Sequence, residues 1–392
     1  MTPAPARSTR HRRHILLFDL DAVLLTSEGY YESLRRAVSL IGEGLGFGAV
    51  RLTQQEIEVF ESLDITAEWD SSAICAALML ARAWEFDPRL RLPEQPPILS
   101  TPPHGLPPPD FSGFARSLTD GDGRVDRPVE RALERLLSLR SDLSSVQLDY
   151  LEGLLRRARD PERSLTFHLI QEFNLGSELF REVYRRPGGL NTPGMLATQD
   201  RPTLPTEVVR RLDTWRRGAD RHVAVITNRP SRSQGTMFNT PEAEIGVRVA
   251  GVEGWPFVAS GALGWFAERH GLPPQAYLKP SPVHVLAGMR LAVDGDVESA
   301  LAAAHDLVTD RAAVVLWNDL EGARVGVFED AAKGMRGARA ARDVLASAGV
   351  PIELELYGIA RSPEKSRALE AVGARVFDSI RPALREALTD DL

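Results

Sequence analysis

The chain has 392 residues, 43% of them hydrophobic and 26% charged, which is typical of a soluble protein large enough for two or more domains. A formal net charge of −7 argues against a dedicated nucleic-acid-binding protein, and a single cysteine excludes an internal disulfide. That residue, Cys75, lies in an apolar run and is expected to be a buried thiol in a reducing cytoplasm.

Residues 1–13 are rich in arginine and are expected to form a flexible basic tail. We do not expect a signal peptide, because the apolar run that follows contains Asp19 and Asp21. No apolar run reaches the ~20 residues that a membrane-spanning helix needs. We therefore expect a cytoplasmic protein with neither a membrane nor a nucleic acid as partner, and its oligomeric state stays open.

Four apolar residues, Ile15 to Phe18, predict a short buried strand, and Asp19 and Asp21 follow directly at its carboxyl end. Ligands of open α/β sheets bind at the carboxyl ends of strands. Two acids at consecutive positions on one face repel each other unless a cation lies between them or one keeps a proton. This pair therefore marks the place where we expect chemistry.

Helical periodicity dominates the chain from residue 26 to residue 204. It is seen over 30–41, 71–86, 129–137, 146–155, 165–173 and 177–184. Residues 93–109 contain eight prolines in seventeen positions, which predicts an extended loop. We predict that 26–204 is a mostly α-helical cap domain inserted after the first strand.

From residue 205 onward, strands alternate with helices. Strands are expected over 222–226, 325–328, 352–357 and 375–377, helices over 208–217 and 297–308, and an extra strand over 312–316. This alternation predicts the α/β class, with a doubly wound, Rossmann-like parallel sheet covered on both faces. Residues 14–25 and 205–392 would together form this catalytic core.

Polar residues also follow the later strands. Thr227 and Asn228 end one strand, Lys279 precedes a proline, and Glu329 and Asp330 end another strand. Phosphoryl transfer needs a nucleophile, a proton donor for the leaving oxygen and positive charge around the transferring group. Carboxylates on two strand ends can also hold Mg²⁺, which prefers hard oxygen ligands. The sequence leaves open whether a further cation, Arg229, contacts phosphate or lies in solvent.

In this order the four segments resemble the motifs of the haloacid dehalogenase superfamily of phosphatases and phosphomutases. The first motif is matched by Asp19-Leu-Asp21-Ala-Val and the second by Thr227. The third is matched by Lys279 before Pro280, and the fourth by the adjacent Glu329 and Asp330. Family members with a helical cap carry it between the first and second motifs, where this chain has its insertion.

The resemblance implies a role for each of these residues. Asp19 would attack phosphorus and form an aspartyl-phosphate, while Asp21 would first protonate the leaving oxygen and then activate water. Thr227, Asn228 and Lys279 would bind the phosphoryl oxygens. Mg²⁺ would be held by Asp19, by the backbone carbonyl of Asp21, and by Asp330 with the assistance of Glu329.

Two features depart from the family pattern. Ala22 stands where the family usually has glycine, which restricts the backbone at a turn, and the cap is over twice the usual length. We expect a Mg²⁺-dependent phosphatase-like hydrolase that acts on a small phosphate monoester. Two alternatives stay open: a phosphomutase that uses the same residues, and a non-catalytic phosphate-ligand-binding or regulatory protein on the same fold.

Overall fold

The computed structural model describes residues 12–119 and 125–388. The chain divides into two compact units. The core unit consists of Met1–Thr26 and Arg201–Leu392, and the helical unit consists of Ser27–Asp200. Within the described ranges, no helix is both long enough and apolar enough to cross a membrane.

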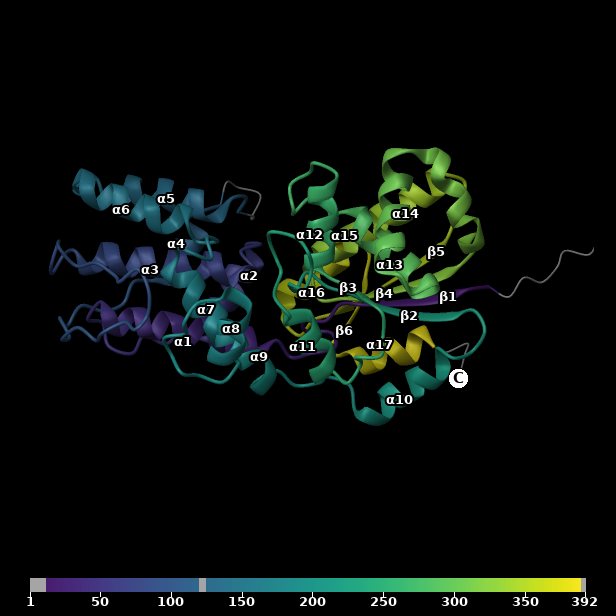
Figure 1. Ribbon diagram of the computed structural model, residues 1–392, viewed down its shortest axis with the longest axis horizontal. Helices are drawn as coiled ribbons and strands as arrows, with labels where there is room; N and C mark the ends of the chain where they lie inside the picture. The colour runs from purple at the N-terminus through teal and green to yellow at the C-terminus, as the bar shows by residue number, and fades with distance from the viewer. Residues whose placement is uncertain (1–11, 120–124, 389–392) are drawn as a thin grey trace, which may run out of the picture. The chain divides into compact units, whose positions relative to one another are not determined.

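Six parallel strands form the sheet of the core unit, as far as its residues are described (Figure 1). They are β1 (His14–Phe18), β2 (Arg221–Ile226), β3 (Phe257–Val258), β4 (Arg324–Glu329), β5 (Glu353–Ile359) and β6 (Arg375–Phe377), in the spatial order β3-β2-β1-β4-β5-β6. The order reverses between β1 and β4, where Phe18 pairs with Phe328. The predicted doubly wound parallel sheet is confirmed. The two-residue strand β3 is too short to give a periodic signal.

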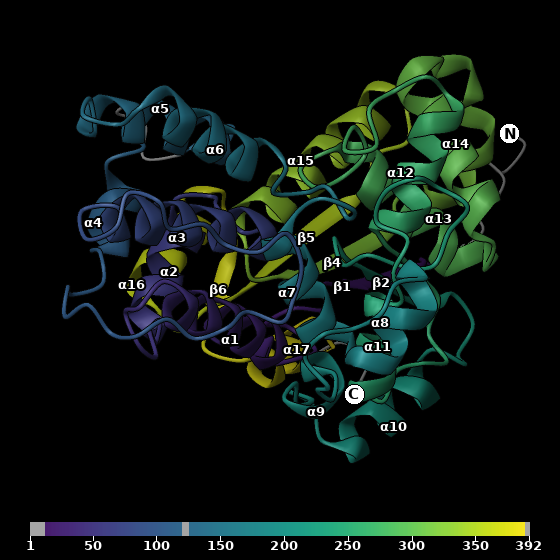
Figure 2. The same cartoon turned by 60° about the vertical axis from the view of Figure 1, so that its left-hand side comes forward.

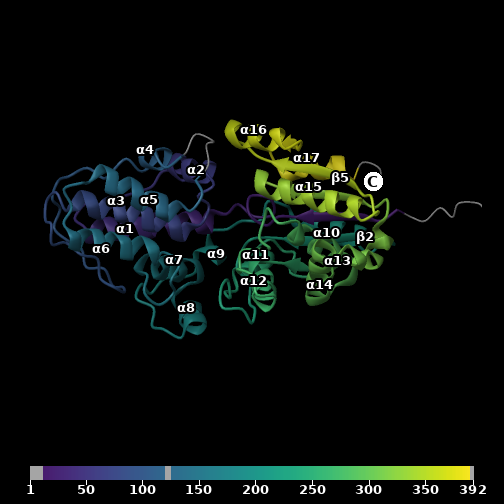
Figure 3. The ribbon, with the colours of Figure 1, turned by 90° about the horizontal axis from the view of Figure 1, so that it is seen from above.

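Helices cover both faces of the sheet, and the side chains of β1 alternate between them. Ile15 and Leu17 pack into one apolar cluster, whereas Leu16 and Phe18 pack into the other. The first cluster includes side chains of α12 (Ser260–Arg269), α13 (Pro282–Asp294), α14 (Val297–Thr309), α15 (Ala332–Ser347) and α16 (Pro363–Ala371), with α13 lying along α14 (Figure 3). The second includes α10 (Thr206–Trp215), α11 (Glu242–Val249) and α17 (Ile380–Ala387). Burial on both faces explains why the strands read as continuous apolar runs.

The extra strand predicted over 312–316 is wrong. These residues belong to a 3₁₀ helix, η1 (Arg311–Leu320). Burial repeats there every three residues: Trp317 and Leu320 are buried, whereas Val315 and Leu316 are exposed. A three-residue repeat is the period of a 3₁₀ helix, so packing of Trp317 and Leu320 overrides the strand preference of the valines.

The predicted flexible tail, residues 1–13, lies largely outside the described residues, which begin at Arg12. The flexibility of this tail stays a prediction, and its last two residues make defined contacts. Arg12 forms an ion pair with Glu353 at 2.5 Å, and Arg13 forms one with Asp319 at 3.0 Å. The carbonyl of Arg13 also accepts the backbone N–H of Arg324, so these residues continue the ladder of hydrogen bonds beyond β1.

The helical unit is built from nine helices within its described part (Figure 2). They are α1 (Glu28–Gly44), α2 (Gln54–Ser62), α3 (Glu68–Ala83), α4 (Phe111–Arg116), α5 (Pro128–Leu139), α6 (Ser145–Arg156), α7 (Leu165–Leu175), α8 (Ser177–Tyr184) and α9 (Met195–Thr198). Helices α1, α3 and α7 pack against one another around an apolar core that includes Cys75. Burial raises the pKa of the Cys75 thiol, which keeps it protonated and inert.

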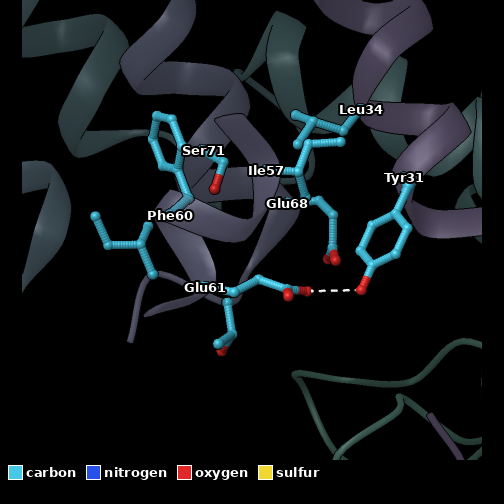
Figure 4. A pocket seen from close by; sticks show the side chains of 9 residues that line it. Tyr31, Leu34, Ile57, Phe60, Glu61, Glu68 and Ser71 are labelled. Carbon is cyan, nitrogen blue, oxygen red and sulfur yellow. Dashed lines mark hydrogen bonds between the residues drawn. The ribbon is translucent and has the colours of Figure 1, made fainter. Parts of the chain in front are cut away.

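The helical unit contains a small pocket lined by residues of α1, α2 and α3 and the loop between α2 and α3 (Figure 4). Its volume is about 260 Å³, including space open to solvent. Apolar side chains such as Leu34 and Phe60 line it together with Glu61 and Glu68. The Tyr31 hydroxyl donates a hydrogen bond to Glu61 at 2.9 Å, so part of its polar lining is satisfied internally.

Candidate functional site

The predicted chemical segments meet at one edge of the core sheet. Asp19 follows β1, Thr227 follows β2, and Glu329 is the last residue of β4. These three strands are parallel neighbours, so their carboxyl ends share one edge, and this edge includes the point where the strand order reverses. The backbone N–H of Asp19 donates to the carbonyl of Phe328 at 2.9 Å, which ties the end of β1 directly to β4.

Lys279 connects two of the acids at this edge. Its Nζ lies 2.9 Å from Asp19 Oδ1 and 2.5 Å from Glu329 Oε1, and it donates to the Ile226 carbonyl at 2.8 Å. The side chains of Lys279 and Glu329 are 3% and 1% exposed, so water contributes little to their solvation. Two carboxylates therefore share one buried ammonium group.

The pKa values of Asp19, Glu329 and Lys279 are all raised, for different reasons. Burial raises the pKa of Glu329 well above its usual range, and the charge of Asp19 adds to this. Burial also raises the pKa of Asp19, although Lys279 opposes the shift. Burial alone would lower the pKa of Lys279, but the two carboxylates outweigh it and raise that pKa. Lys279 is thus a fixed cation, and additional positive charge would stabilise the ionised acids.

A third acid completes a group of oxygens that fits a metal ion. Carboxylate oxygens of Asp19, Glu329 and Asp330 all lie within 4.8 Å of one another. Oε2 of Glu329 is buried and has no hydrogen-bond partner in the part of the chain that the structure describes. The site also needs Gly334, since a Cβ there would lie 2.4 Å from that oxygen. Hard oxygen donors with an orphaned buried oxygen are suited to a small divalent cation such as Mg²⁺.

Asp21 has a different partner. Arg229 donates from Nε to Asp21 Oδ2 at 2.9 Å and from Nη2 to Asp21 Oδ1 at 2.5 Å. The Arg229 side chain is 1% exposed, so it does not lie in solvent, whereas that of Asp21 is 29% exposed. Next to it, Ala22 has a φ of 55°, the left-handed conformation that glycine adopts more easily. The Asp21 side chain therefore has its own cationic partner, while its charge still adds to the raised pKa of Asp19.

Thr227 and Asn228 order the loop after β2. The Thr227 hydroxyl accepts the backbone N–H of Arg229 at 3.1 Å, and the Asn228 side-chain carbonyl accepts the backbone N–H of Lys279 at 3.3 Å. The bond from Lys279 to Asn228 links the third predicted motif to the second. The proposed contacts of Thr227 and Asn228 with a phosphoryl group stay predictions.

One residue at this edge is not among those predicted from the sequence. Lys365, in the first turn of α16, forms an ion pair with Asp330 at 3.0 Å. Helix α16 follows β5, the neighbour of β4, so its first turn lies beside the end of β4. A signal existed in the sequence: polar residues that follow the next strand of a parallel sheet lie at the same edge.

No family model and no curated protein matches the sequence. The X-ray structure of structural-genomics target ZR25 is similar with a TM-score of 0.59 and 16% identity, covering 97% of this chain and 99% of that chain. Phosphatase Tt82 from Thermococcus thioreducens aligns with a TM-score of 0.44 and 14% identity, covering 91% and 99%. A hydrolase from Pseudomonas syringae aligns with a TM-score of 0.31 and 14% identity, covering 97% and 99%. At these identities the likeness to ZR25 shows a shared fold.

The resemblance to the haloacid dehalogenase superfamily holds at the level of the fold. The sheet is parallel and doubly wound, and the helical unit is inserted between β1 and β2. The first, second and fourth motif segments lie at the ends of three adjacent strands, and Lys279 of the third joins the first to the fourth. The chain thus has the fold and the placement of motif segments that the resemblance predicts.

Proposed function

We propose that this protein is a Mg²⁺-dependent phosphatase that hydrolyses a small phosphate monoester through an aspartyl-phosphate on Asp19. The observation that carries the proposal is the convergence of three carboxylates within 4.8 Å beside a buried lysine at the strand-order reversal. A nucleophilic carboxylate, metal ligands and a fixed cation are the parts that phosphoryl transfer requires.

In the first step, a carboxylate oxygen of Asp19 forms a bond to phosphorus while the bond from phosphorus to the leaving oxygen breaks. Asp21 gives a proton to that oxygen, so that an alcohol leaves instead of an alkoxide. Lys279 balances negative charge on the transferring group. Mg²⁺ held by Asp19, Glu329 and Asp330 would supply further charge stabilisation there.

In the second step, Asp21 accepts a proton from a water molecule whose oxygen attacks phosphorus. The bond between phosphorus and Asp19 breaks, which releases inorganic phosphate and restores the free carboxylate. The two steps together consume one water and return Asp21 and Asp19 to their starting forms. If a second hydroxyl of the substrate replaced water, the same residues would perform the phosphomutase reaction.

The test is phosphate release from a panel of small phosphate monoesters, in Mg²⁺ or in EDTA. We compare the wild type with Asp19→Asn and, as a matched control, with Asp306→Asn on the exposed surface of α14. We expect Mg²⁺-dependent release by the wild type and the control, and none by Asp19→Asn. Release that persists in EDTA or in Asp19→Asn would contradict the proposal. An isomerised ester with little free phosphate would favour the phosphomutase.

A further inference from the structure

We propose that Arg229 is a positioning residue for the proposed reaction, and that its two-pronged bond to Asp21 holds the carboxyl group in the orientation needed for proton transfer. The inference rests on the proposed function, because it assigns Asp21 the proton transfers. It goes beyond the proposed function by assigning a role to a residue outside the three clustered carboxylates and Lys279.

The geometry of the pair is that of a rigid clamp. Two nitrogens of one guanidinium group bond to the two oxygens of one carboxylate, at 2.9 and 2.5 Å. An arginine fork has a fixed planar geometry that matches a carboxylate, which a lysine ammonium group cannot reproduce. The plane of the Asp21 carboxylate is therefore set by Arg229.

Arg229 is itself held in place. Its backbone N–H donates to the Thr227 hydroxyl at 3.1 Å, and its carbonyl accepts the backbone N–H of Ser260 at 3.1 Å. Helix α11 encloses the guanidinium group: a Cβ at Gly246 would lie 3.0 Å from Arg229 Nη1. Asp21, by contrast, is partly exposed and lies beside the strained residue Ala22. The buried Arg229 therefore fixes the more exposed side chain of Asp21.

The clamp leaves Asp21 able to act. A carboxylate has about four lone-pair positions, and the fork uses one on each oxygen. The fork therefore fixes the plane of the group without using every acceptor position of the carboxylate. Arg229 would thus contribute orientation, and its loss would affect the steps in which Asp21 moves a proton.

Substrates with different leaving groups separate this role from phosphate binding. An alkyl phosphate such as glycerol phosphate needs a proton on its leaving oxygen, whereas p-nitrophenyl phosphate leaves as a stable phenolate. We expect Arg229→Gln to lower kcat for glycerol phosphate about 100-fold, within the range of general acid catalysis, and to lower kcat for p-nitrophenyl phosphate less than about 10-fold. KM should change little for both substrates. Arg229→Lys keeps the charge without the fork and should restore only part of the loss.

The matched control is Arg159→Gln, which removes an equivalent fork in the helical unit. Arg159 bonds to Asp70 at 3.0 and 2.6 Å. Its loss should lower stability without changing the ratio of the two kcat values. If Arg229→Gln fails to fold, as judged by circular dichroism, the ratio of the two kcat values is measured with Arg229→Lys instead. A lower ratio than in the wild type then supports the inference, and an unchanged ratio overturns it.

Three outcomes would overturn the inference. An equal loss of kcat for both substrates would mean that Arg229 acts on something other than leaving-group protonation. A rise in KM for both would mean that Arg229 binds the phosphoryl group directly. If the wild type hydrolyses no ester of the panel, the proposed function fails together with the inference. Wild-type hydrolysis with an unchanged ratio of the two kcat values in the variants removes the inference alone.

Discussion

Lys279 offsets the negative charge of the acids at the carboxyl ends of the core strands. It is a buried cation that contacts two carboxylates, Asp19 and Glu329. Removing one partner of a buried ion pair leaves an uncompensated charge or forces a group to take up a proton, and either change is costly. Stability and reactivity at this edge therefore depend on the same side chain.

We predict that Lys279→Met lowers the free energy of unfolding by about 3 kcal/mol and abolishes phosphate release. Urea denaturation followed by circular dichroism measures the first effect. Lys365→Met is the control, because Lys365 is 31% exposed, so the loss of its ion pair with Asp330 should cost less than about 1 kcal/mol. Equal effects of the two substitutions would show that Lys279 is not the main counter-charge.

Ala22 is a second residue with a measurable consequence. Its φ of 55° is left-handed, a conformation that costs an L-residue roughly 1–2 kcal/mol in the folded chain. Glycine avoids this cost, but its greater conformational freedom stabilises the unfolded chain by about 0.5–1 kcal/mol. We therefore predict that Ala22→Gly raises the free energy of unfolding by about 0.5 kcal/mol. Ala340→Gly, in the middle of α15 and partly exposed, should lower it by about 1 kcal/mol. A loss of stability in both variants would contradict the strain at residue 22.

At the scale of elements, α7 carries a buried carboxylate that organises the end of the helical unit. Glu172 is fully buried and accepts hydrogen bonds from the Ser177 hydroxyl at 2.6 Å and from the backbone N–H groups of Gly189 and Leu190 at 2.9 Å. His168 Nε2 lies 3.2 Å away. Burial alone would raise the pKa of Glu172, but these bonds outweigh it and lower it to about 2.

The sign of the resulting pH dependence follows from proton binding. The unfolded chain binds a proton near pH 4.5 and the folded chain near pH 2, so folding stability is lost as pH falls through this window. The full shift corresponds to a loss on the order of 3 kcal/mol. Glu172→Gln should be less stable than the wild type at pH 7, with the difference shrinking as pH falls toward 2. Urea denaturation from pH 7 to pH 3 tests this, and a difference independent of pH would contradict it.

Much of the core unit follows from local sequence patterns. Strands that are buried on both faces, such as β1 and β4, are continuous apolar runs in the sequence. They can therefore be recognised from the sequence, together with the acids at their carboxyl ends. The 3₁₀ helix over Arg311–Leu320 is not, because its conformation is set by where Trp317 and Leu320 pack. The pairing of Arg229 with Asp21, 208 positions apart, also depends on side chains meeting across neighbouring strands, which no periodicity encodes.

At the scale of the whole molecule, a metal bound only by the folded chain should stabilise it. The acids at the site lie at the carboxyl ends of β1 and β4, so they converge only when the sheet has formed. We predict that Mg²⁺ raises Tm relative to EDTA, with a dependence on concentration that follows mass action. Asp330→Asn should reduce this shift, whereas Asp306→Asn should not. A Tm that is unchanged by Mg²⁺ would argue against a resident metal.

The measurement that tests the central claim most directly is mass spectrometry of the protein quenched in acid during turnover of a phosphate monoester. The account predicts a phosphoryl adduct on the peptide that contains Asp19, sensitive to hydroxylamine and absent from Asp19→Asn. Phosphate release without such an adduct, or an adduct on another residue, would contradict Asp19 as the nucleophile.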